Sequence, residues 1–389
     1  MSFARPVSPN EKIWLGADRL APFLISTVLE GSGALDEAAF RRAAQEASRA
    51  HPGARLVLRG FGRWLRWEDS GRDAPVRVVS QRGWDFLQEP MDVKRGPTCE
   101  VILWPGQPQR VAIRAHHAVM DGGGMATFAL DLFRALRGEK LAGSSSTVID
   151  LDVARSLGKG DSARWDVPAP APTGSPRGSA RGVEWRRISL PGRARGAVAP
   201  VVRALAEAAW EHAQALVRLH VAADLRRHLQ EAATANLVGV ISLEVTPETD
   251  ERALKKQMLA ALRAGSEARH LLDLARVRDA PLWAVAFGIR RSLARSQRTG
   301  LYAPSAAVSF IEIDEATASG GGFVAERVVG IPPLAEFLAC IVDIVTTRQA
   351  TDAIVAVPAC LAGDGRLDAL CARLEAVLTR AARSGPAHP

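Results

Sequence analysis

The stretch "AIRAHHAVMDGGG", residues 112–124, places two adjacent histidines at the end of an apolar run, followed by an aspartate and three glycines. The chain has only 8 histidines in 389 residues, so two side by side are uncommon. Alternating apolar residues before the pair and a helical pattern after the glycines predict a strand, a turn and a helix. We therefore expect the histidines where a central strand turns into a helix.

Apolar periodicity extends this pattern in both directions. Before residue 155 it predicts helices over residues 34–50 and 125–137, strands over 54–60, 64–69 and 76–80, and a hairpin of 99–104 with 110–117. After residue 184 it predicts helices over 198–217, 251–264 and 366–383, strands over 217–226 and 236–245, a helix including 284–295 and a hairpin within 342–359. Because strands and helices do not alternate strictly, the pattern indicates an α+β protein.

The chain is too long for one ordinary hydrophobic core. Residues 155–184 are rich in Pro, Gly, Ala and Ser and have no apolar period, so we interpret them as an exposed linker. This divides the chain into an N-terminal lobe over residues 1–154, the linker over 155–184 and a C-terminal lobe over 185–389.

The composition, 47% hydrophobic and 24% charged, is that of an ordinary globular protein. The net charge of +8 comes from scattered arginines, and only one tyrosine is present, which argues against a nucleic-acid interface. The arginine content either reflects only a GC-rich coding sequence or provides a positive field for an acidic partner, such as a phosphate-bearing cofactor or an acidic carrier protein. No apolar run reaches the roughly 20 residues of a membrane span, and the N-terminus lacks a secretory pattern. We expect a cytoplasmic protein.

The histidine pair allows several interpretations. Asp121 could simply cap the following helix in a polar turn. A metal site could use His117 and Asp121, but it lacks a recognisable third ligand. Nucleophilic hydrolysis lacks a GxSxG motif. The remaining interpretation is general base catalysis, since imidazole is well matched to taking a proton from an alcohol or amine near neutral pH. The other six histidines are expected to be structural or on the surface.

The segment "HHAVMDGGG" resembles the HHxxxDG motif of the CoA-dependent acyltransferase superfamily, which includes chloramphenicol acetyltransferase and the condensation domains of nonribosomal peptide synthetases. The order of helices and strands is similar over nearly the whole chain, although only the motif is specific. The resemblance implies a chloramphenicol acetyltransferase-like α+β fold with two pseudo-dimeric lobes and an active site in a cleft or tunnel between them.

The same resemblance implies a stand-alone acyltransferase in natural-product biosynthesis. Its donor would be a phosphopantetheine thioester, either acyl-CoA or an acyl or peptidyl carrier protein, and its acceptor a small-molecule alcohol or amine. No permanently bound cofactor and no metal are expected, and the protein is expected to be a monomer. Two alternatives remain: a lipid- or wax-type ester synthase, and a non-catalytic module that recruits carrier proteins.

Residue by residue, the resemblance makes His117 the catalytic base and His116 a structural residue of the loop. Asp121 would hold the loop through an arginine. Arg226 matches a recurrent arginine of the family, and Arg114 is the alternative partner.

The glycines and one serine complete the expected site. Gly122 would keep the channel open for a pantetheine arm, and Gly123, Gly124 and Ser309 are further candidates to line that channel. The DFGWG motif of condensation domains is absent, and residues 307–322 occupy its approximate place. This departure puts orthodox peptide-bond formation on an assembly line in doubt, but leaves acyl transfer as the expectation.

Overall fold

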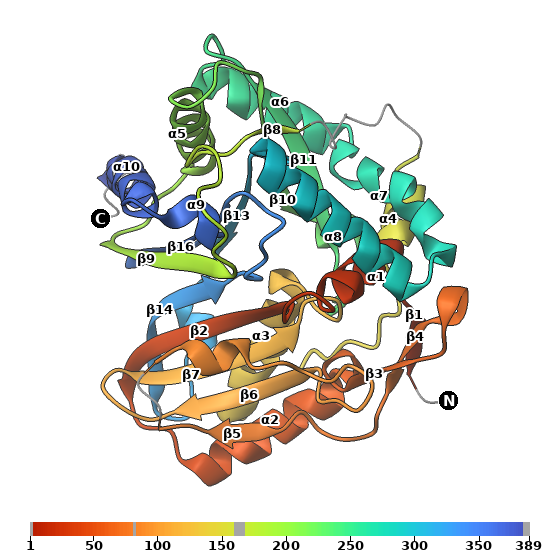
Figure 1. The fold of residues 1–389 in the computed structure, drawn as a ribbon. Helices are drawn as coiled ribbons and strands as arrows, with labels where there is room; N and C mark the ends of the chain where they lie inside the picture. The colour runs from red at the N-terminus through yellow and green to blue at the C-terminus, as the bar shows by residue number, and fades with distance from the viewer. Residues whose placement is uncertain (1–2, 81–82, 159–167, 384–389) are drawn as a thin grey trace.

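The chain forms two lobes that lie against each other, each built on a mixed β-sheet with helices (Figure 1). The structure is a computed structural model and describes residues 3–80, 83–158 and 168–383. The expected α+β class and two-lobed architecture are confirmed. None of the helices in these ranges is long and apolar enough to cross a membrane.

The first lobe contains a five-stranded sheet in the order β14-β2-β7-β6-β5, with β5 parallel to β6 and the other pairs antiparallel. Its strands are β2 (Leu24–Gly33), β5 (Val76–Val78), β6 (Cys99–Trp104), β7 (Gln109–His116) and β14 (Phe323–Ile331). Helices α2 (Glu37–Ala50) and α3 (Gly122–Leu136) bury their apolar sides against it. A small sheet adds β1 (Ala4–Pro6), β3 (Leu56–Arg59) and β4 (Arg66–Asp69).

The second lobe contains a six-stranded sheet in the order β11-β10-β13-β15-β16-β9. Its strands are β9 (Val183–Pro191), β10 (Val217–Asp224), β11 (Val238–Val245), β13 (Ala306–Glu312), β15 (Ile341–Thr346) and β16 (Ala350–Pro358). Helices α5 (Val198–Trp210), α6 (Glu251–Arg263) and α10 (Arg366–Arg383) pack on one face and form the largest core. The short elements are α4 (Asp150–Ser156), α7 (Arg269–Asp273), α9 (Ala359–Ala362), β8 (Ala169–Pro170) and β12 (Leu301–Tyr302).

Two helices lie where the lobes meet. Helix α1 (Pro9–Ala17) packs against α8 (Leu282–Thr299) of the second lobe, as Figure 1 shows. Ser8 caps α1 in a capping box with Glu11, so its first turn is fixed by reciprocal hydrogen bonds. The start of the chain is therefore held against the C-terminal half.

The predicted helices and hairpins are present near their expected positions, although α5 already ends at Trp210. One expectation is wrong in part: Ala169, Ala171 and Thr173 lie within the predicted exposed linker but are buried, and Ala169–Pro170 pairs with β12. Residues 159–167 of the same segment lie outside the described residues. The lobe boundaries themselves stay a prediction.

Strand β14 comes from the C-terminal half of the chain but belongs to the sheet of the first lobe. It pairs antiparallel with β2 from Phe323↔Gly33 to Ile331↔Ser26, with one irregularity after Ala325. Gly31 makes this close approach possible, because a side chain there would overlap the backbone carbonyl of Val324. The two halves of the chain are therefore interlocked by main-chain hydrogen bonds.

This interlocking predicts that cutting the chain between the lobes leaves them associated. A protease site inserted after Gly158 should be cleaved to give two fragments that co-elute on size exclusion, because eight of the nine residues of β14 remain paired with β2. Denaturant should separate the fragments, and the uncut insertion variant serves as the control. Fragments that separate in native buffer would contradict the interlocked arrangement.

Candidate active site

The two histidines of the motif lie at the end of the central strand β7. The backbone N–H of His116 donates to Thr98 O at 2.9 Å, and that of His117 donates to Phe23 O at 2.9 Å. These bonds continue the pairing of β7 with its neighbours past the last strand residue. The backbone that carries both imidazoles is therefore fixed by the sheet, as the sequence predicts.

The imidazole of His117 is held in one orientation. Its Nδ1 lies 3.1 Å from Met120 O, and because a carbonyl only accepts, Nδ1 carries the hydrogen and Nε2 keeps a lone pair. Asn236 Nδ2 is a weaker neighbour of Nδ1 at 3.4 Å and donates instead to His117 O at 2.6 Å. Trp14 and Phe23 lie nearly parallel to the ring, with centroids 6.0 and 5.6 Å away.

Burial lowers the pKa of His117 below its ordinary value, against the opposing effects of its bond to Met120 O and of the nearby Asp121 carboxylate. The side chain remains partly exposed. Its neutral form, with an accepting Nε2, is therefore the dominant one at neutral pH. This is the protonation state that a general base requires.

His116 points the other way, into the protein. Its side chain is fully buried, its Nδ1 accepts from Ala118 N at 3.2 Å, and its Nε2 lies 3.2 Å from Asp18 Oδ1. The same Asp18 oxygen accepts from Phe23 N, next to the ring that stacks on His117. His116 therefore contacts Ala118 and Asp18 inside the protein, and its fully buried ring does not reach solvent.

Asp121 joins the motif to the second lobe. Its Oδ1 accepts from Arg226 Nη2 at 2.7 Å, and its Oδ2 accepts from Arg226 Nη1 at 3.1 Å, a bidentate pair. The carboxylate also accepts from Gly124 N and Leu237 N at 2.7 Å each, so it caps α3 and holds the segment before β11. Burial opposes ionisation, but Arg226 and these bonds outweigh it and hold the pKa of Asp121 below its ordinary value. Arg114, the alternative partner, pairs instead with Glu100.

The three glycines allow α3 to start in contact with the second lobe. A side chain on Gly123 would overlap the Arg226 guanidinium, and one on Gly124 would overlap the carbonyl of Thr234. Gly122 faces Ile311 of β13. The lobes therefore pack closely against Gly123 and Gly124 because these residues have no side chains. That the glycines line a channel stays a prediction.

Ser309, the last of the expected channel residues, lies on β13 opposite Asp343 of β15. Burial raises the pKa of Asp343 to about 6, against the smaller opposing effect of a hydrogen bond from Ser309. Residues 307–322, which occupy the approximate place of the absent DFGWG motif, form most of β13 and the connection to β14. Ser309 does not line the cavity described next.

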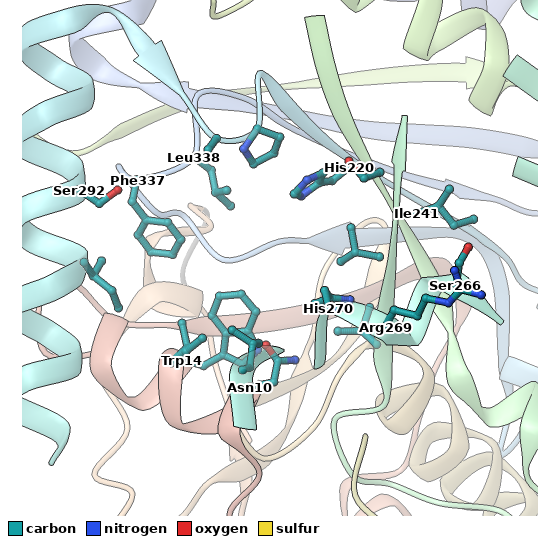
Figure 2. Close-up of a pocket in the computed structure, with 18 of the residues that line it drawn as sticks. Asn10, Trp14, His220, Ile241, Ser266, Arg269, His270, Ser292, Phe337 and Leu338 are labelled. Carbon is teal, nitrogen blue, oxygen red and sulfur yellow. The ribbon is translucent and has the colours of Figure 1, made fainter. Parts of the chain in front are cut away.

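A cavity of about 590 Å³ lies beside the motif, between α1, α8, α7 and the sheet strands β10 and β11 (Figure 2). Trp14 lines this cavity and also stacks on His117, while Phe337 lines it and stacks on Phe23 at 6.0 Å. The imidazole is therefore separated from the cavity by a layer of aromatic rings. A volume of this size is typical of small-molecule sites.

Several of these residues carried no sequence signal. Trp14, Phe23 and Asn236 are single residues in segments far from the motif, and only folding brings them to His117. His220 and His270 were expected to be structural residues or to lie on the surface, but the structure places both on the cavity wall. Their position on a strand and a short helix could not be related to the motif without the fold.

The comparisons with known proteins agree with this architecture. No family model matches the chain, and no curated protein matches its sequence. Among solved structures it is similar to the first condensation domain of the calcium-dependent antibiotic synthetase in complex with a substrate analogue, with TM-score 0.70 and 16% identity over 99% of this chain and 97% of that chain.

Two further structures are similar over almost their whole length. The starter condensation domain of rhizomide synthetase RzmA, in complex with C8-CoA and Leu-SNAC, matches with TM-score 0.65 and 16% identity over 98% of this chain and 95% of that chain. The condensation domain of the Monacolin K polyketide synthase MokA matches with TM-score 0.64 and 14% identity over 98% of both chains. The chain therefore has the two-lobed condensation-domain fold.

The buried pair predicts coupled effects of mutation. Asp121→Asn should lower the free energy of unfolding by about 3 kcal/mol, because Arg226 then loses its counter-charge in a buried site. The double variant Asp121→Asn/Arg226→Gln should lose less than the sum of the single losses. Denaturant unfolding measures both.

The matched control is Asp364→Asn, which breaks the exposed ion pair with Arg177 and should change stability by less than about 1 kcal/mol. Strictly additive losses at Asp121 and Arg226 would show that the two side chains do not act as a pair.

Proposed function

We propose that this chain is an acyltransferase that moves an acyl group from a pantetheine thioester to an alcohol or an amine. The observation that carries the proposal is the neutral, oriented imidazole of His117, at the junction of the lobes and beside a largely apolar cavity. The condensation-domain fold supports it by analogy. Because one of the similar structures holds C8-CoA, acyl-CoA is the donor we propose to test first, with a carrier-protein thioester as the second.

The chemistry follows from the state of His117. Nε2 takes the proton of the acceptor O–H or N–H as the oxygen or nitrogen attacks the thioester carbonyl carbon. The tetrahedral intermediate then collapses, the C–S bond breaks, and the imidazolium returns the proton to the departing thiolate. The products are an ester or an amide and a free thiol, so atoms and charges balance. In this proposal His116 and Asp121 are positioning residues that hold the loop.

The positioned base also favours an enzyme over a module that only recruits carrier proteins, since recruitment has no use for a neutral imidazole with a free lone pair. The direct test is incubation of the full chain with octanoyl-CoA and a panel of alcohols and amines, with products identified by mass spectrometry. Thiol release that depends on one acceptor class would support acyl transfer. No product from CoA or carrier-protein donors with any acceptor would overturn it.

Substitution of the base should affect turnover far more than stability. With a verified substrate pair, His117→Ala should reduce kcat by about 10²- to 10⁴-fold, the usual contribution of a positioned base, while donor binding persists. His116→Ala is the matched control and should instead lower the melting temperature, because that ring is fully buried against Ala118 and Asp18. An unchanged kcat in the His117 variant would place the base elsewhere.

The lowered pKa of His117 also sets the pH profile. The base must be neutral, so kcat/KM should be constant through neutral pH and fall only as the pH drops below the ordinary imidazole pKa of about 6.5. Because the pKa of His117 is lowered, the acid limb of the kcat/KM profile should lie at a lower pH than that of an ordinary histidine. Rates measured from pH 4.5 to 8.5, with folding checked by circular dichroism, test this. An acid limb centred above 6.5 would contradict the assignment.

A further inference from the structure

The wall of the cavity opposite Trp14 carries two buried polar atoms without hydrogen-bond partners. His220 on β10 and Ser242 on β11 are directly paired in the antiparallel register, so their side chains project side by side. Within the described ranges His220 Nε2 and Ser242 Oγ have no partner, and both residues line the cavity. Figure 2 shows His220 and Trp14 across the open space from each other.

Unpaired polar atoms in such a place need an explanation. A buried donor or acceptor without a partner destabilises the fold, and an apolar side chain of similar shape would avoid that cost. The lining around this pair is largely apolar, with Val238, Val240 and Ile289 among its residues. A ligand that brings its own polar group to His220 and Ser242 would remove the cost.

The charge of the wall restricts what that polar group can be. Burial, with smaller contributions from His270 when it is protonated and from Arg218, lowers the pKa of His220 to about 3, and burial lowers the pKa of His270 to about 4. Both rings are therefore neutral at neutral pH. Among the described residues that line the cavity there is no Asp or Glu to bind a cation, and the one charged side chain is Arg269 of α7, whose Nη2 donates to Ala264 O at 3.5 Å. The part of the wall formed by His220 and Ser242 is uncharged, and a hydroxyl fits it because a hydroxyl can both donate and accept.

Gly288 of α8 lies both on the cavity wall and at the surface. Gly288 lines the cavity and is exposed, and a side chain added there would meet nothing within 4 Å. A glycine inside a helix is less stable than an alanine would be, and no neighbouring atom within 4 Å requires a glycine here. The empty space beside Gly288 is consistent with an entrance that a ligand passes.

We propose that this cavity binds the apolar part of a substrate that carries a hydroxyl group, with the hydroxyl held by His220 and Ser242. This rests on the proposed function in so far as the bound group is part of a substrate of His117. The connection is Trp14, whose ring lies between the imidazole and the cavity. The bound part of the substrate is either the acyl chain of the donor or the hydrocarbon part of the acceptor, since both can be apolar and carry a hydroxyl.

Binding can be measured without turnover. The acyl probes are the N-(2-acetamidoethyl)amides of octanoic acid and of 3-, 5- and 8-hydroxyoctanoic acid, in which an amide replaces the reactive thioester. The acceptor probes are octan-1-ol and octane-1,3-diol. Isothermal titration of the full chain should show at least one hydroxylated probe binding about tenfold more tightly than its parent. The series in which this happens identifies the donor or the acceptor as the source.

Variants of the polar pair test the assignment. His220→Leu and Ser242→Ala should each remove the preference for the hydroxylated probe and leave binding of the parent compound unchanged or tighter. His212→Leu, the same change at an exposed histidine outside the cavity, should keep the preference. Equal binding of parent and hydroxylated probes in the wild-type chain, or a preference that survives both substitutions, would overturn the proposal.

The entrance has its own matched pair. Gly288→Phe should weaken all the probes by at least tenfold, whereas Ala294→Phe, at an exposed position of the same helix outside the cavity lining, should not. Unchanged binding in Gly288→Phe would overturn the assignment of this cavity. Tight, His220-dependent binding without any thioester turnover would instead contradict the proposed function and leave the binding site standing.

Discussion

The ion pair between Asp121 and Arg226 is the constraint on which the arrangement at the motif depends. Asp121 caps α3 and follows the histidine loop in the first lobe, whereas Arg226 follows β10 in the second lobe. Both side chains are nearly buried, so the pair is satisfied only when the lobes are in contact and the loop has its observed shape. The glycines after Asp121 serve the same contact, since side chains on Gly123 or Gly124 would push the lobes apart.

The orientation of His117 follows from this junction. Asn236 donates a hydrogen bond to the His117 carbonyl, and the backbone N–H of the next residue, Leu237, donates to Asp121. One segment of the second lobe therefore holds both motif residues. The first lobe supplies the remaining partners, Met120 O and the ring of Phe23. A neutral imidazole with its lone pair free is thus a product of contacts from both lobes, and the cavity beside Trp14 lies where those contacts end.

The interlocked sheets explain why the lobes can hold such a junction. Strand β14 carries the C-terminal half into the first sheet, and an apolar cluster between the lobes joins Val28 and Ile102 of that sheet to Ile354 of the other. Separating the two halves of the chain would have to break this main-chain ladder as well as side-chain contacts. Both kinds of contact therefore hold the two halves of the chain together beside the site.

The sequence by itself determined the α+β class, most helices and hairpins, and the strand-turn-helix context of the motif, because apolar periodicity and glycine positions are local properties. It also supplied Arg226 as one of two partners for Asp121, through a resemblance rather than through spacing. It did not predict strands β2, β9, β13 and β14 or helix α1, and it treated residues 169–173 as exposed although they are buried.

Only the tertiary structure decided between Arg226 and Arg114, placed Trp14, Phe23 and Asn236 around His117, and brought His220 beside Ser242 on the cavity wall. Some of these contacts join residues more than a hundred positions apart in the sequence. Each contact depends on burial and strand register, which no local sequence pattern encodes.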